Sequence, residues 1–286
     1  MTVLEVIQKS ADFLAKKGVE SPRLQVELLL AHLLKMPRMK LYLNFERKLT
    51  EAELTPLRAL VVRRGQREPL QHLTGSTSFC GLEMAVNRHV LIPRPETELL
   101  AELGWQFLNQ LPASDSQRPT AVDFGAGSGC LAITLAAKCP AAHVTALDIS
   151  PDALAVARQN AANNQVAGRI QFLQGDGFAA LNGTNRFDLI VSNPPYIASA
   201  EIATLDPEVR DHDPRIALDG GGDGLGFYRR LAAEAAAFLK PGGKLMMEFG
   251  EGQADALQKI FTAQNWVVEA VRDDYSHRAR ILIVRR

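Results

Sequence analysis

The chain has 286 residues and a formal net charge of zero, with 47% hydrophobic and 22% charged residues. This composition is typical of a folded globular protein and excludes an intrinsically disordered chain, while the neutral charge argues against a dedicated duplex-DNA binder. Because the length exceeds that of one typical domain, we expect two domains, and we expect no direct specific binding of DNA.

The cysteines and the lengths of the apolar runs indicate the cellular compartment in which the protein is expected. The three cysteines, Cys80, Cys130 and Cys139, are an odd number without a C-x-x-C pair, which is typical of reduced thiols. No apolar run approaches membrane-spanning length, and the N-terminus lacks the hydrophobic region of a signal peptide. We therefore expect a cytoplasmic protein without a membrane partner.

Residues 1–75 have the pattern of a small helical domain. Apolar residues recur near the helical period at the start, Ser21-Pro22 opens a second, largely apolar helix, and Thr50-Glu51-Ala52-Glu53 matches a capping box that begins a third. The 13 Lys and Arg against 8 Asp and Glu in this region are weak evidence for an acidic or RNA-rich partner, and a solvated helix face explains them better. Without a catalytic constellation, these helices indicate a packing or recognition domain.

Residues 76–95 differ in composition from the helical region. Gly81, Asn87 and Pro93 punctuate short apolar runs, which predicts a β-hairpin linking two domains. The segment leads into residues 91–98, where two prolines and alternating charges make a rigid polar loop that includes Arg94. Composition leaves two interpretations of this loop open, an interdomain elbow and a wall of an active site.

From residue 120 onward, strands alternate with helices, which predicts a parallel sheet covered on both faces. We expect strands at 120–124, 143–147, 170–173, 187–192, 244–249, 266–271 and 279–284, the last two antiparallel because a short turn joins them. Helices are expected at 97–108, 130–138, 151–164, 227–239 and 253–263. The long loop at 201–226 is typical of a functional lid.

Four strand ends carry unusual residues, and ligands of open α/β sheets bind outside such ends. The first is the glycine-rich turn Gly125-Ala126-Gly127-Ser128-Gly129, which lets a ligand approach the backbone at a helix N-terminus, although a tight strand-to-helix turn is the structural alternative. The second is Asp148, placed to accept from a ribose diol, because Ser150 is the better cap for the next helix. The third is Asp176-Gly177-Phe178.

The fourth strand ends in Asn193-Pro194-Pro195-Tyr196, a stiff turn because each proline fixes φ and donates no N–H. The acceptors that face outward are the side-chain oxygen of Asn193 and the carbonyl of Pro194. Together they would hold both protons of an amide or exocyclic amine, with Tyr196 as a wall of the pocket or as ordinary packing. A metal at His212, between Asp211 and Asp213, is disfavoured against capping and loop roles, so we expect no metal site.

On these motifs the chain resembles class I S-adenosylmethionine-dependent methyltransferases, and more closely the PrmC/HemK family of release factor glutamine methyltransferases. The closer resemblance rests on Ser21-Pro22-Arg23 and on residues 69–75, 91–98 and 206–228. It implies a Rossmann-like α/β fold with a mostly parallel seven-stranded sheet and a small N-terminal helical domain. The implied domains are a recognition domain (1–75), a hairpin linker (76–95) and a methyltransferase domain (96–286), in a monomer.

The resemblance also implies the chemistry. The cofactor is S-adenosylmethionine, with S-adenosylhomocysteine as product, and the substrate is the glutamine of the Gly-Gly-Gln loop of peptide chain release factors, methylated on its amide nitrogen (N5). The implied catalytic residues are Asn193, Pro194 and Tyr196, with Pro195 and Arg94 also binding substrate. The implied cofactor-binding residues are Gly125, Ala126, Gly127, Ser128, Gly129, Asp148, Asp176, Gly177, Phe178 and Asn193.

Two positions depart from the family pattern, and three other functions remain open. Gly177 stands where some members carry a large aromatic residue, so Phe178 or backbone groups would contact the adenine, and Asp213 replaces a usual Glu. The alternatives are a glutamine methyltransferase acting on a ribosomal protein, a nucleic-acid amino methyltransferase, and a cofactor-binding module without catalysis. The match of residues 1–98 disfavours the nucleic-acid enzyme, and the intact Asn193 disfavours the inactive module.

Overall fold

The protein, in a computed structural model that describes residues 1–112 and 118–286, consists of two compact units. One unit comprises Met1–Ser76 together with Leu205–His212, and the other comprises Thr77–Thr204 together with Asp213–Arg286. From the sequence, all of residues 96–286 are expected to form one domain. The segment Leu205–His212 departs from that division because its contacts are made with helices far away in the sequence.

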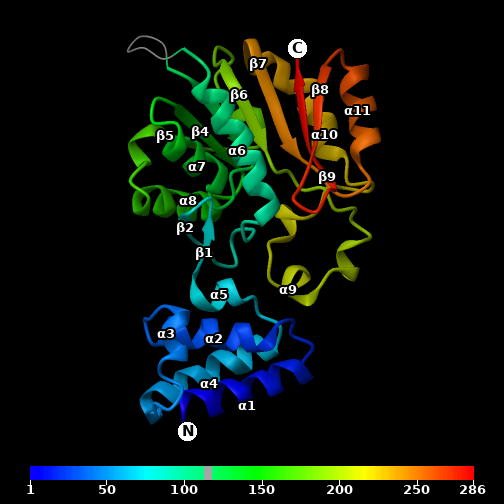
Figure 1. Ribbon diagram of the computed structural model, residues 1–286. Coiled ribbons are helices and arrows are strands. Elements are labelled where there is room, and N and C mark those ends of the chain that lie inside the picture. The colour runs from blue at the N-terminus through cyan, green and yellow to red at the C-terminus, as the bar shows by residue number, and fades with distance from the viewer. Residues whose placement is uncertain (113–117) are drawn as a thin grey trace. The chain divides into compact units, whose positions relative to one another are not determined.

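The first unit is a helical bundle built from α1 (Val3–Lys16), α2 (Pro22–Leu33), α3 (Arg38–Tyr42), α4 (Glu51–Gly65), α5 (Leu70–Thr74) and α9 (Pro207–Arg210) (Figure 1). The predicted capping box begins α4, where the Thr50 N–H donates to Glu53 Oε2 at 2.9 Å. The short helices α3 and α5 were not predicted. Buried aliphatic side chains of α1, α2 and α4 form the core of this unit.

The predicted hairpin is present as β1 (Ser76–Phe79) and β2 (Leu82–Ala85). It is not a free linker, because Phe79 and Met84 are fully buried in the core of the second unit. The Asn160 side chain of α8 (Pro151–Asn163) also bonds both polar backbone groups of Ala85, at 2.7 and 3.0 Å. The hairpin is therefore packed as part of the sheet-bearing unit.

The second unit contains a seven-stranded sheet in the order β5-β4-β3-β6-β7-β9-β8, as predicted mostly parallel. Only β9 runs antiparallel to its neighbours, β7 and β8. The strands are β3 (Thr120–Phe124), β4 (His143–Asp148), β5 (Ile170–Gln174), β6 (Phe187–Ser192), β7 (Leu239–Glu248), β8 (Val267–Asp273) and β9 (Ala279–Arg285). The strand order reverses between β3 and β6, which opens a crevice at their carboxyl ends.

Helices cover both faces of this sheet (Figure 1). Alternate residues of each strand point to opposite faces: Ala121 and Leu189 join a core with α6 (Pro95–Asn109), α7 (Cys130–Lys138) and α8, whereas Val122 and Ile190 join one with α10 (Gly226–Glu234) and α11 (Ala254–Ala263). The predicted helix 227–239 was too long, because Ala235–Phe238 forms a 3-10 turn and β7 already begins at Leu239.

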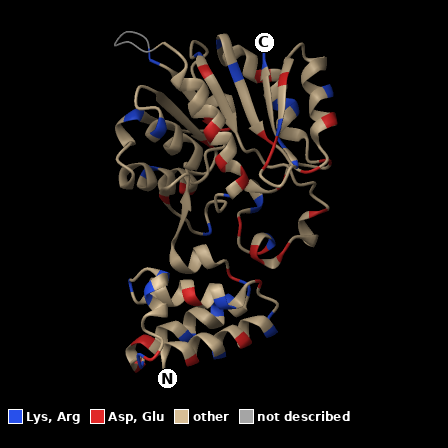
Figure 2. Cartoon of the chain, in the orientation of Figure 1, with Lys and Arg blue, Asp and Glu red and all other residues tan. Residues whose placement is uncertain are grey.

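Basic and acidic residues are interspersed over the helices and loops of each unit (Figure 2). Within residues 1–112 and 118–286, no helix is long and apolar enough to cross a membrane. The same residues contain no group of three His, Cys, Asp or Glu side chains that could hold a metal ion.

Candidate active site

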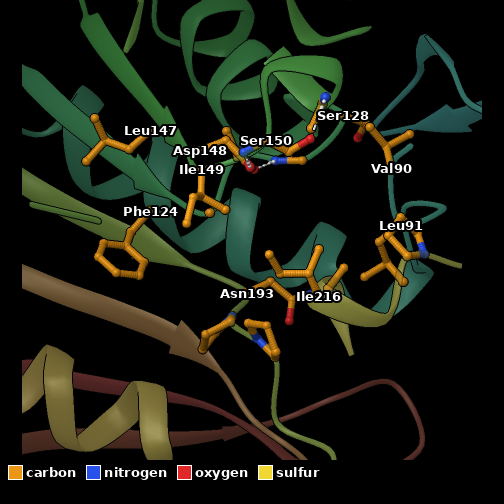
Figure 3. A pocket seen from close by; sticks show the side chains of 18 of the residues that line it. Val90, Leu91, Phe124, Ser128, Leu147, Asp148, Ile149, Ser150, Asn193 and Ile216 are labelled. Atoms are coloured by element: carbon orange, nitrogen blue, oxygen red, sulfur yellow. Dashed lines mark hydrogen bonds between the residues drawn. The ribbon is translucent and has the colours of Figure 1, made fainter. Parts of the chain in front are cut away.

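A cavity lies at the carboxyl ends of β3, β4, β5 and β6 (Figure 3). Most of the residues singled out in the sequence meet there, although they come from four different strand ends and from the loop before α6. Three of them do not line it: Gly129, Phe178 and Tyr196. Those that do are Arg94, Gly125, Ala126, Gly127, Ser128, Asp148, Asp176, Gly177, Asn193, Pro194 and Pro195.

The glycines of the β3–α7 turn have different roles. Gly125 and Gly127 have φ angles of 80° and 54°, and a Cβ on either would meet no atom within 4 Å, so the space above them is open. Gly129 has φ 79°, but its Cβ would lie 3.0 Å from Ala157 Cβ of α8. The first two glycines therefore leave room for a ligand, while the third permits close packing of α7 and α8.

Asp148 is oriented by backbone groups at the end of β4. Its Oδ2 accepts from the Gly127 N–H and its Oδ1 from the Ser150 N–H, each at 2.8 Å (Figure 3). Ser150 is the cap of α8, as predicted, because its Oγ accepts from the Ala153 N–H at 3.1 Å. The lone pairs left on the Asp148 carboxylate are free to accept from hydroxyl groups of a ligand.

The end of β5 differs from the expectation. Gly177 has φ 60°, and a Cβ there would lie 2.7 Å from Cε2 of Phe124, whose ring lines the cavity. Phe178 is only 3% exposed, stacks on Phe238 with ring centroids 4.8 Å apart and does not line the cavity. The alternative expectation, that backbone groups contact the adenine, stays a prediction. The Phe124 ring therefore occupies the space that a side chain at position 177 would enter.

Asn193 lies at the end of β6, and the NH₂ group of its side chain is hydrogen-bonded within the protein. Its Nδ2 donates to Thr97 Oγ1 at 3.1 Å, and the Thr97 hydroxyl donates to Glu248 Oε2 at 2.6 Å. Within the described residues, neither Asn193 Oδ1 nor the Pro194 carbonyl accepts a hydrogen bond. Figure 3 shows Asn193 across the cavity from Asp148. Two acceptors at this strand end therefore remain available to a ligand.

Thr97 and Glu248 were not recognised in the sequence as residues of the site. Thr97 lies in residues 91–98, the segment that two prolines and alternating charges mark in the sequence as a rigid polar loop. Glu248 is the last residue of β7, so a fifth polar strand end was a signal that could have been used. Both side chains are buried, at 2% and 1% exposed, and burial raises the pKa of Glu248 to about 7.

The remaining predicted residues flank the cavity. The Tyr196 carbonyl accepts from Gln253 Nε2 at 2.9 Å and its ring packs beside Gly250, against the core formed with α10 and α11. Burial raises the pKa of Tyr196 to about 12, which keeps the phenol neutral. Arg94 lines the cavity and its Nη2 donates to Asp213 Oδ2 at 2.7 Å, so Asp213 orients the guanidinium.

The sheet is doubly wound, and its strand ends carry the features of a cofactor site. A glycine-rich turn follows the first strand, a carboxylate follows the second and paired acceptors follow the fourth. Together, these features define the architecture of class I methyltransferases. Residues 5–75 match the family described as the PrmC N-terminal domain, and residues 104–206 match the methyltransferase small domain.

Comparison with curated relatives identifies the family within the methyltransferase class. A release factor glutamine methyltransferase from Geobacter sulfurreducens is 44% identical over 261 residues, which cover 91% of this chain and 88% of the relative. The enzymes of the same name from Chlorobaculum tepidum and Deinococcus radiodurans are 41% and 40% identical, covering 95% and 100% of this chain and 93% and 99% of theirs. The chain belongs to the release factor glutamine methyltransferase family and is an enzyme of the methyltransferase class.

Solved structures agree with the fold. A methyltransferase from Pyrococcus furiosus is similar with a TM-score of 0.51 and 19% identity, covering 72% of this chain and 90% of that one. The hMettl16 catalytic domain is similar with a TM-score of 0.54 and 14% identity, covering 82% and 81%. At these identities the likeness concerns the fold alone.

Proposed function

We propose that the chain transfers a methyl group from S-adenosylmethionine to the side-chain amide nitrogen (N5) of the glutamine in the Gly-Gly-Gln loop of peptide chain release factors. The observation that carries the proposal is the pair of acceptors at the edge of the cavity, Asn193 Oδ1 and the Pro194 carbonyl, to which none of the described residues donates a hydrogen bond. Membership of the family supports the choice of substrate.

The residues of the cavity fit S-adenosylmethionine. The open space above Gly125 and Gly127 suits close approach of a ligand to the backbone, and the Asp148 carboxylate suits a ribose diol. Phe124, Leu147 and Ile149 supply apolar surface for an adenine ring. When bound, the cofactor supplies an electrophilic methyl group on its sulfonium.

Asn193 and Pro194 would act on the substrate amide. An amide nitrogen is a weak nucleophile because its lone pair is delocalised into the carbonyl. By accepting hydrogen bonds from both N–H groups, the two oxygens would orient that lone pair and favour electron density on nitrogen. The nitrogen would gain the methyl group and give up one of its two protons to solvent. The chain then needs no dedicated base, since positioning and electrostatics supply most of the acceleration.

The first unit would recognise the release factor, with residues 1–75 as the recognition domain and residues 96–286 as the main body of the methyltransferase domain. The match of residues 5–75 to the PrmC N-terminal domain supports this assignment. We propose that the enzyme acts as a cytoplasmic monomer, with Arg94 contributing to substrate binding at the cavity.

Mass spectrometry tests the proposed function directly. A release factor and, separately, a large-subunit ribosomal protein are incubated with this protein and methyl-labelled S-adenosylmethionine. A single methyl group on the Gly-Gly-Gln glutamine is the expected result. A methyl group on the ribosomal protein alone would overturn the substrate and retain the pocket chemistry, and no methyl group on either would overturn both.

A further inference from the structure

Three buried or half-buried side chains from distant parts of the chain form one hydrogen-bonded series, Glu248–Thr97–Asn193. The Thr97 hydroxyl, on the first turn of α6, lies 2.6 Å from Glu248 Oε2 at the end of β7 and 3.1 Å from Asn193 Nδ2 at the end of β6. Glu248 does not line the cavity, whereas Thr97 and Asn193 do. The hydrogen-bonded link from Glu248 to the cavity lining therefore runs through Thr97.

The donors and acceptors of this series are fixed in one order, because the Thr97 hydroxyl has only one proton to donate. When Glu248 is ionised it can only accept, so the Thr97 hydroxyl must donate to it and can only accept from Asn193. The NH₂ group of Asn193 is then drawn toward Thr97 and its oxygen faces the ligand. A side-chain amide left to itself could present either group, and the NH₂ group would repel the N–H bonds of a substrate amide.

We propose that Thr97 and Glu248 are positioning residues that determine the polarity of the Asn193 amide, so that its oxygen is presented to the nitrogen to be methylated. The inference rests on the proposed function, because it concerns how the acceptor of that function is oriented. Neither residue touches the reacting atoms; they act through Asn193.

Protonation of Glu248 removes the constraint. A neutral carboxyl can donate to Thr97, which frees the Thr97 hydroxyl to donate toward Asn193 and allows the amide to turn. Burial raises the pKa of this carboxyl to about 7, so the change falls near neutral pH. The titratable or charged groups that face Glu248 are Arg94 at the N-cap of α6, Glu96 in its first turn, Cys130 of α7, Tyr196 after β6, Tyr228 of α10 and Arg280 of β9.

A hydrogen bond to the backbone of Glu248 fixes the position of this residue relative to Thr97. The Tyr228 hydroxyl donates to the Glu248 carbonyl at 2.8 Å, and Tyr228 is a fully buried residue of α10. Arg94 and Arg280 are paired with Asp213 and Asp274, and burial raises the pKa of Tyr228 well above its ordinary value. Glu248 is thus the group of this series whose charge changes as the pH crosses 7.

The test compares Thr97→Val, Thr97→Ser and Glu248→Gln in methylation of a release factor, with Thr134→Val as a matched control. Thr134 is also fully buried, but it lies in α7 outside the cavity lining. Thr97→Val should lower kcat about tenfold to a hundredfold with little change in KM, because it disturbs orientation rather than binding. Thr97→Ser, which retains the hydroxyl, should restore most of the activity, and Thr134→Val should retain it.

The pH profile separates positioning from a purely structural role. Wild-type kcat should rise as the pH increases through about 7, and Glu248→Gln, which cannot ionise, should have a low kcat without that rise. A wild-type kcat that is flat across this range, or a folded Glu248→Gln protein with wild-type kcat and profile, would overturn the inference. If the wild type itself fails to methylate the release factor, the proposed function is what fails.

Discussion

Arg64 and Glu208 are 144 residues apart in the sequence, and Arg64 Nη2 donates to Glu208 Oε1 at 2.8 Å inside the first unit. Arg67 Nε donates to the same oxygen at 2.6 Å. These bonds attach α9 to the N-terminal helices. The part of the loop 201–226 around Glu208 is therefore held to the N-terminal helices. The role of this loop as a lid stays a prediction.

Replacing Glu208 by Gln should destabilise the first unit. Arg64 is only 4% exposed, and the substitution leaves its charge without a counter-ion, although Gln25 Oε1 at 2.6 Å still accepts from it. We expect the free energy of unfolding in urea to fall by about 1–3 kcal/mol. Glu251→Gln is the control, because the Arg278–Glu251 pair is exposed and should contribute less than about 1 kcal/mol. Equal effects of the two substitutions would contradict the role of Glu208.

The Glu208 contribution should depend on pH in a defined direction. Burial alone would raise the pKa of Glu208, but the hydrogen bonds from Arg67 and Arg64 together hold that pKa below its ordinary value of 4.5. The stabilisation is therefore fully present above pH 4.5 and is lost as the pH falls below it. The difference in unfolding free energy between wild type and Glu208→Gln should shrink on acidification below that pH, and a constant difference would argue against it.

Asn193→Ala should abolish most of the methylation while the protein stays folded. The substitution removes one of the two acceptors for the substrate amide, and loss of one such preorganised group costs on the order of 100-fold to 1,000-fold in kcat. Thermal unfolding and kcat are measured together. Asn109→Ala, at the exposed end of α6, is the control that should retain activity. Full activity of Asn193→Ala would refute the proposed mechanism.

Asp148→Asn should weaken binding of the cofactor. The carboxylate accepts from two backbone N–H groups, and an amide can accept from only one of them while its NH₂ group faces the other. We expect the Kd for S-adenosylhomocysteine, measured by calorimetry, to rise about tenfold or more. The matched control is Asp255→Asn, on the exposed first turn of α11. An unchanged Kd for Asp148→Asn would exclude Asp148 from the cofactor site.

Gly177→Ala should be destabilising because of a backbone and a steric effect. The φ of 60° is unfavourable for a residue with a Cβ, and that atom would lie 2.7 Å from Phe124. We expect a loss of about 2 kcal/mol in unfolding free energy together with weaker cofactor binding, since Phe124 lines the cavity. Gly168→Ala, where no atom lies within 4 Å of the added carbon, should change neither. Similar results for both variants would contradict the crowding at Gly177.

Asp123→Asn should change the pH dependence of stability. Asp123 is fully buried in β3, and burial raises the pKa of its carboxyl from 3.8 to about 7. The folded state then binds a proton that the unfolded state has lost, so the free energy of unfolding falls as the pH rises between these values. The free energy of unfolding of the variant lacks this fall. Measured in urea titrations, it should rise relative to that of the wild type by about 1–3 kcal/mol between pH 5 and pH 8. If the unfolding free energies of the wild type and the variant depended on pH in the same way, the raised pKa of Asp123 would be ruled out.

The cavity was predictable from the sequence where its chemistry is local. The positive φ angles of Gly125 and Gly127, the Ser150 cap and the stiff turn at Asn193-Pro194 depend on neighbouring residues, so their residue types indicate them. The carboxyl ends of parallel strands share one edge of the sheet, and the alternation of strands and helices was enough to bring these turns together.

Tertiary packing decided the rest. Phe178 faces the core and Phe124 faces the cavity because each has a particular position relative to the sheet, which residue type does not specify. The contacts Thr97–Glu248 and Arg64–Glu208 join residues 151 and 144 positions apart. The sequence alone determined the doubly wound fold and the acceptor turn, because periodicity and backbone restriction are local. Which side chains orient Asn193 was decided only when β6, β7 and α6 packed together.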